Sequence, residues 1–154
     1  MTTIRFTEST TAPPEQFVAA ITDFGPGRRE VFRNSTDKYL KVHSEGVGTA
    51  DVTEGSYGIW ERLRYDWTDP HRVVMTTVDS NLWGGASGHT YTLTPEPNGT
   101  TRLDVVVVRE GKNLRGRITE LLVGSVGKGM LRKALQGTIK AVEERGPTSG
   151  PAGS

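Results

Sequence analysis

The hydrophobic period of the chain changes once, near residue 113, and this change restricts the folds that are open to it. Between residues 39 and 110, apolar and polar side chains alternate in five runs separated by turn residues, which is typical of antiparallel strands. From residue 113 to about 145, apolar side chains recur at helical spacing. A meander followed by one long helix indicates an α+β fold.

The shorter segments complete this order. Residues 2–10 alternate as a first strand, residues 12–24 have helical spacing after two prolines, and residues 28–34 suit one more short helix. The five alternating runs cover residues 39–54, 57–67, 72–83, 88–96 and 101–110. We therefore expect a curved antiparallel sheet of about six to seven strands wrapped on one long C-terminal helix, with two short helices after the first strand.

The long helix carries five interior glycines, each of which costs about 1 kcal/mol relative to alanine. They are Gly116, Gly124, Gly127, Gly129 and Gly137. Glycines at this density indicate a kink, a close approach to the sheet, or space left for another molecule. A curved sheet on such a helix can leave an internal cavity, and a functional site is expected there.

Composition excludes several classes of function. The 19 lysines and arginines nearly balance the 18 aspartates and glutamates, so the whole chain has little attraction for nucleic acid. There is no cysteine, and three dispersed histidines without acidic neighbours at ligand spacing argue against a metal site. We expect no cofactor.

The length suits one domain, residues 1–145, followed by a flexible tail of glycine, proline and serine at residues 146–154. The first residues lack the basic and apolar regions of a signal peptide, and no window approaches the ~20 apolar residues of a membrane span. A cytoplasmic location without an integral membrane segment is therefore expected.

One carboxylate, Glu61, interrupts the apolar face of the strand at residues 57–67. The alternate positions on this face are Tyr57, Ile59, Glu61, Leu63, Tyr65 and Trp67. Desolvation in an apolar cavity predicts a raised pKa for Glu61, which suits a ligand anchor or a general acid/base. The alternatives are a buried ion pair and a position at the wet mouth of the pocket.

Two stretches, GVGTADV at residues 46–52 and WERLRYDWTDPHRVVM at residues 60–75, complete a familiar pattern. With the element order, they make residues 2–145 resemble the START/Bet v 1-like (SRPBCC) superfamily, in particular its polyketide cyclase/dehydrase-like or lipid-transport-like branch. The resemblance implies a helix-grip fold with a deep, mostly apolar cavity for a small hydrophobic ligand. It also implies that Glu61 faces the pocket and that the loop after Trp83 gates it.

Three further polar residues are candidates for this pocket. His89 and Tyr91 share one strand face, and His89 lies two strands from Glu61, about 10 Å away by strand spacing. The favoured alternative for His89 is a core histidine satisfied by a hydroxyl or backbone group. Arg109 either faces inward, to bind an acidic ligand group or neutralise Glu61, or reaches solvent from the strand end, which is the preferred interpretation.

The remaining candidates are apolar or basic. Besides the residues already named, the predicted cavity lining consists of Phe24, Phe32, Val107, Val126 and Met130. Residues 112–133 carry six basic side chains and one acidic one, which indicates either contact with phosphate or lipid headgroups or simply a solvated helix face.

Three functions fit these features. The first is binding of a small hydrophobic or aromatic molecule with Glu61 as the polar anchor. The second is an enzyme of cyclase, dehydratase or isomerase type, in which Glu61 with His89 or Tyr91 moves protons on an enolisable substrate. The third is a stress-response or interaction module that acts through a protein partner.

Overall fold

A computed structural model describes residues 1–147 of the chain. Its elements, in chain order, are β1 (Thr2–Thr10), α1 (Pro14–Ile21), α2 (Arg28–Val31), β2 (Lys41–Gly46), β3 (Thr49–Ser56), β4 (Ile59–Asp66), β5 (Arg72–Ser80), β6 (Gly88–Pro95), β7 (Thr101–Arg109) and α3 (Leu114–Arg145). The tail predicted at residues 146–154 falls almost entirely outside the described residues.

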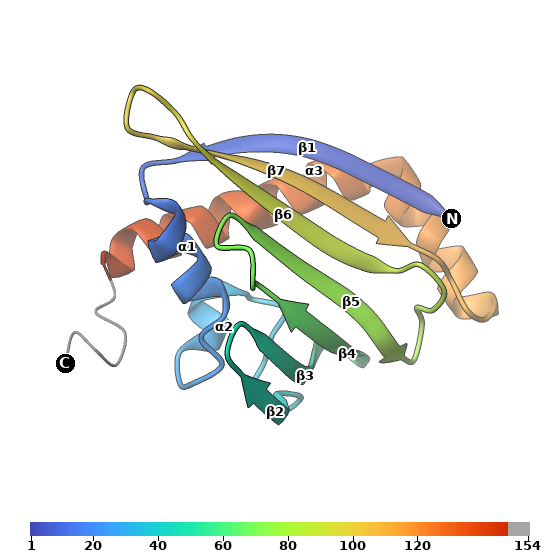
Figure 1. The fold of residues 1–154 in the computed structure, drawn as a ribbon. Coiled ribbons are helices and arrows are strands. Elements are labelled where there is room, and N and C mark those ends of the chain that lie inside the picture. The colour runs from blue at the N-terminus through green and yellow to red at the C-terminus, as the bar shows by residue number, and fades with distance from the viewer. Residues whose placement is uncertain (148–154) are drawn as a thin grey trace.

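The seven strands form one antiparallel sheet in the order β1-β7-β6-β5-β4-β3-β2. The long helix α3 lies against one face of this sheet, behind it in Figure 1, while α1 and α2 cover one end. The predicted α+β helix-grip architecture is therefore confirmed. Within residues 1–147, no helix combines the length and apolar character needed to cross a bilayer.

The run at residues 39–54 is two strands, because a turn at Val47 and Gly48 divides it. A second tight turn, Tyr57–Gly58, joins β3 to β4, and both of its residues have positive φ, 51° and 79°. This is the backbone of a type I′ hairpin turn, which removes Tyr57 from the strand. The prediction that Tyr57 faces inward is wrong, since its side chain is 94% exposed.

Helix α3 packs on the rest of the protein unevenly. Asn113 caps its start by accepting a hydrogen bond from the Gly116 backbone N–H at 2.8 Å. A Cβ at Gly116 would lie 2.2 Å from the Leu82 carbonyl oxygen, so this glycine permits a close approach. The C-terminal half buries Leu135, Ile139 and Val142 in the core, whereas apolar residues of the N-terminal half stay exposed. Between the close approach at Gly116 and the packed C-terminal half, the middle turns of α3 therefore leave a space on their sheet side.

Candidate functional site

A cavity of about 660 Å³ lies between the inner face of the sheet and α3. Most of its wall is apolar. The predicted lining residues that it includes are Phe32, Ile59, Glu61, Leu63, Tyr65, Trp83, His89, Tyr91, Val107, Arg109, Val126 and Met130, and the exposed Tyr57 lies at its rim. Its wall also contains residues that the sequence reasoning missed, chiefly Ser35, Glu54, Leu122 and Ala134.

Glu61 is bound inside this cavity by Arg109. The guanidinium donates from Nη1 to Oε2 at 2.8 Å and from Nη2 to Oε1 at 3.1 Å, and the Thr77 hydroxyl donates to Oε2 at 2.8 Å. The side chains of Glu61 and Arg109 are only 15% and 11% exposed. The preferred interpretation of Arg109 as a solvent-facing strand-end residue is wrong. Val105, Val107 and Arg109 lie on the same face of β7, and this face lines the cavity.

The pKa of Glu61 departs from the sequence-based expectation. Burial raises it, but the charge of Arg109 and the hydrogen bonds from Arg109 and Thr77 together outweigh burial and lower it. The predicted raised pKa is therefore wrong. Glu61 is ionised at neutral pH and is an acceptor of hydrogen bonds rather than a proton donor.

His89 lies on the other side of the same arginine, with its Nε2 atom 3.0 Å from Arg109 Nη2. Because a guanidinium only donates, Nε2 must accept, so the ring is neutral and its proton sits on Nδ1. Burial, followed by the charge of Arg109, lowers the pKa of His89 to about 4, with Glu61 opposing. His89 was predicted to bond to a hydroxyl or backbone group, but its partner is the charged side chain of Arg109. Within the described residues, Nδ1 is buried without a partner.

The pH dependence of stability tests whether His89 is neutral in the folded protein. Its pKa in the folded protein lies below the ordinary value of about 6.5, so the unfolded chain binds a proton first as the pH falls. Stability is therefore lost below pH 6.5, by about 2 kcal/mol between pH 7 and pH 5. Urea unfolding should show this loss in the native protein and in His71→Gln, whose histidine lies in an exposed turn. His89→Gln should lose much less, and equal losses in the two variants would contradict the assignment.

Trp83 belongs to the cavity wall. Its ring is buried, Arg109 stacks over it at 5.0 Å, and its backbone pairs with Gly111. The loop that follows is held to Glu110, which accepts hydrogen bonds from the Gly84 and Ala86 backbone N–H groups. Trp83 thus helps to fix Arg109 rather than standing on a loop over the pocket.

A second buried ion pair, missed by the sequence reasoning, lies at the α2 end of the cavity. Arg28, fully buried, donates from Nε to Glu54 at 2.8 Å and from Nη2 to the Tyr65 hydroxyl at 2.8 Å. Tyr65 also donates to Glu54. Phe24, expected in the lining, instead packs against Arg28 and Tyr65 and is not part of the cavity wall. Strand alternation could have predicted that Glu54 faces inward, because it shares one face of its strand with the apolar residues Ala50 and Val52.

The two carboxylates of the cavity are direct neighbours. Glu54 on β3 and Glu61 on β4 are opposite each other in the strand register. Like charges in that position repel. Each carboxylate has its own arginine, from α2 and from β7, and this arrangement keeps both charges compensated in an apolar wall.

The other polar groups of the cavity limit the reactions that it can support. Burial is the main cause that raises the pKa of Tyr91 to about 12, so its hydroxyl stays protonated at neutral pH. Within residues 1–147, no three histidine, aspartate or glutamate side chains gather closely enough to hold a metal ion. The cavity wall therefore offers two carboxylates, each paired with an arginine, together with the neutral histidine His89 and the phenols of Tyr65 and Tyr91, set in apolar surroundings.

Comparison with solved structures places the fold among known proteins. A protein from Thermus thermophilus is 16% identical, with a TM-score of 0.73 over 94% of this chain and 99% of that one. The Zhui aromatase/cyclase from a Streptomyces species is also 16% identical, with a TM-score of 0.69 over 97% and 98% of the two chains. A START superfamily protein from Mycobacterium smegmatis is 14% identical, with a TM-score of 0.62 over 90% and 97%.

Sequence comparison is consistent with this likeness. No curated protein sequence matches the chain significantly. A family model described as polyketide cyclase/dehydrase and lipid transport matches residues 1–143. The predicted resemblance to the START/Bet v 1-like superfamily is confirmed. Because the match covers nearly all of its 154 residues, the chain belongs to the polyketide cyclase/dehydrase and lipid transport family.

Proposed function

We propose that the protein binds one small hydrophobic or aromatic molecule in the cavity, with the Glu61–Arg109–His89 cluster as its polar anchor. The observation that carries the proposal is a cavity of about 660 Å³ whose apolar wall is interrupted by this cluster. Cavities of roughly 300–1,000 Å³ with a few convergent polar groups are typical of small-molecule sites.

Arg109 sets the chemistry of the anchor. A guanidinium has five N–H donors. In the described part of the chain, Arg109 makes two hydrogen bonds to Glu61 and one contact to His89. The two remaining donors suit an oxygen acceptor, such as a carbonyl, phenolate or carboxylate. The ligand is therefore an apolar molecule with an acceptor oxygen at one end.

Catalysis of cyclase, dehydratase or isomerase type is the second candidate. It is favoured by the fold shared with an aromatase/cyclase and by an arginine placed to stabilise an enolate beside a carboxylate. The lowered pKa of Glu61 and the raised pKa of Tyr91 make both weak proton-transfer groups at neutral pH. Binding is therefore the leading function, and a ligand recovered unchanged after long incubation supports it over catalysis.

Filling the cavity tests the binding site. Val123 lies on α3, is partly buried and lines the cavity, so Val123→Phe adds a ring to the space that a ligand needs. We expect it to lower the affinity for the fluorescent probe 8-anilino-1-naphthalenesulfonate, an apolar aromatic anion, by about tenfold, the loss of about 1.4 kcal/mol of binding free energy. Fluorescence titration measures the affinity.

The matched control is Lys140→Phe, which adds the same ring to an exposed position of the same helix. It should bind the probe like the native protein. If the two variants bind the probe equally, the probe binds elsewhere on the protein, and this result contradicts the cavity as its binding site. Native mass spectrometry of the protein purified from its host then identifies the natural ligand.

A further inference from the structure

The N-terminal half of α3 presents an apolar stripe to solvent. Leu114, Ile118 and Leu121 are spaced by four and three residues and so share one face of the helix. Their side chains are 76%, 52% and 73% exposed, and none of them lines the cavity. Gly116, on the opposite side of the same turns, makes the close approach to the Leu82 carbonyl oxygen, so the stripe faces away from the body of the protein. The stripe is left without an internal partner.

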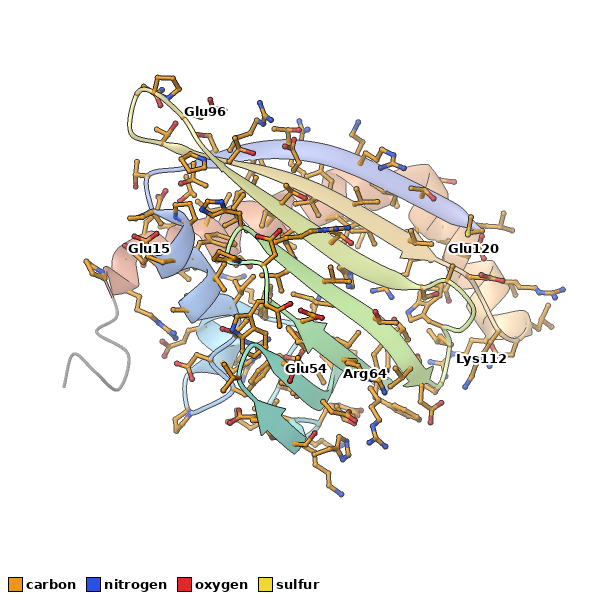
Figure 2. The ribbon with its side chains drawn as sticks, in the orientation of Figure 1. Glu15, Glu54, Arg64, Glu96, Lys112 and Glu120 are labelled. Atoms are coloured by element: carbon orange, nitrogen blue, oxygen red, sulfur yellow. The ribbon has the colours of Figure 1, made fainter. Side chains whose placement is uncertain are left out.

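Basic side chains lie beside this stripe and farther along the same helix. Arg115, Arg117, Lys128 and Lys133 are exposed, and within residues 1–147 none of the four forms an ion pair. The single acid among the first turns, Glu120, is turned toward β1, where it contacts the N-terminal amine at 3.0 Å. Figure 2 shows Glu120 beside the N-terminal start of β1. The exposed face therefore carries uncompensated positive charge.

We infer that the α3 docking face binds the surface of an anionic lipid bilayer. This face consists of Leu114, Ile118 and Leu121, with Arg115 and Arg117 beside them and Lys128 and Lys133 farther along the helix. An apolar helix stripe with basic flanks inserts its apolar side chains at the headgroup boundary while lysine and arginine meet anionic headgroups. The charge and the apolar residues lie on one helix, so both contacts form together.

The charge distribution argues against a second copy of the chain as the occupant. In a two-fold symmetric dimer the same patch meets itself. The four unpaired basic residues would then face one another, and the opposing acid that such a contact needs is already engaged with the N-terminal amine. An anionic bilayer supplies the missing negative charge.

The docking face adjoins the cavity. Leu122, Val126 and Met130 follow on the neighbouring side of the helix, are exposed, and line the cavity. Docking thus sets the cavity rim beside the lipid, and an apolar ligand passes between them with little exposure to water. This last step rests on the proposed function, whereas bilayer docking itself does not.

Sedimentation with vesicles tests the inference. The full chain is expected to bind phosphatidylcholine vesicles that contain about 30 mol % phosphatidylglycerol, and to bind pure phosphatidylcholine vesicles at least tenfold more weakly. Raising the salt to about 0.5 M should release much of the bound protein. Ile118→Gln/Leu121→Gln and Arg115→Gln/Arg117→Gln should each lower the bound fraction at least fivefold, because one removes insertion and the other attraction.

The matched controls are Val47→Gln, an exposed apolar residue of the β2–β3 turn, and Arg64→Gln, an exposed arginine of β4 labelled in Figure 2. Both should bind like the native protein. Equal binding to neutral and anionic vesicles, or variants of α3 that match the controls, overturns the inference. So does a stable dimer in analytical ultracentrifugation that Leu121→Gln dissociates. The docking variants should keep native affinity for the fluorescent probe, so failure of docking is distinguishable from failure of the cavity proposal.

Discussion

Replacing Arg28 by methionine is expected to destabilise the protein by about 4 kcal/mol, the cost of breaking a buried ion pair by removing one partner. The Arg28 side chain is fully buried and contacts Glu54 at 2.8 Å. It also donates to the carbonyl oxygens of Ile21 at 2.6 Å and Asp23 at 3.0 Å. Methionine fills similar space but leaves Glu54 charged and two buried carbonyls without this donor.

Urea unfolding followed by circular dichroism measures the loss as a lower midpoint at an unchanged slope. The matched control is Arg29→Met, at the adjacent exposed position, which should cost less than about 0.5 kcal/mol. Adding Glu54→Gln to Arg28→Met should recover part of the loss, because it removes the unpaired charge. A loss in Arg28→Met no greater than that in Arg29→Met would contradict the structural role of the pair.

The fold was predictable from the sequence because its signals are local. Alternation at residues 2–10 and helical spacing after Asn113 each follow from side chains that must face one core. The turn at Tyr57–Gly58 was not predictable from alternation. A tyrosine with positive φ is unusual, and the alternating pattern continues through it without a break.

The site was less predictable, because its geometry depends on residues far apart in the chain. The inward direction of Glu61 follows from strand parity, but its partner Arg109 is 48 residues away. A run of four valines before Arg109 hides which face of β7 is buried. The sign of the pKa shift of Glu61 depends on that partner, so burial alone gave the wrong direction.

Replacing Arg109 by methionine is expected to lower the stability of the folded protein in a way that depends on pH. The variant leaves Glu61 mostly buried with the Thr77 hydroxyl as its hydrogen-bond donor, so we expect a loss of about 3 kcal/mol at pH 7. Without the guanidinium, the pKa of Glu61 rises above its unfolded value. That part of the loss should therefore shrink as the pH falls and the buried carboxylate takes up a proton.

The double variant Arg109→Met/Glu61→Gln decides between a structural and a ligand-binding arginine. Removing both charges should restore most of the stability, because a neutral pair of similar shape leaves no buried charge uncompensated. If Arg109 binds the ligand, affinity for the anionic fluorescent probe stays about tenfold lower in this stable double variant. Arg102→Met, on the same strand but with exposed ion pairs, should change neither quantity by much. Native affinity in the double variant would mean that Arg109 serves only to neutralise Glu61, and the anchor would then have to lie elsewhere in the cavity.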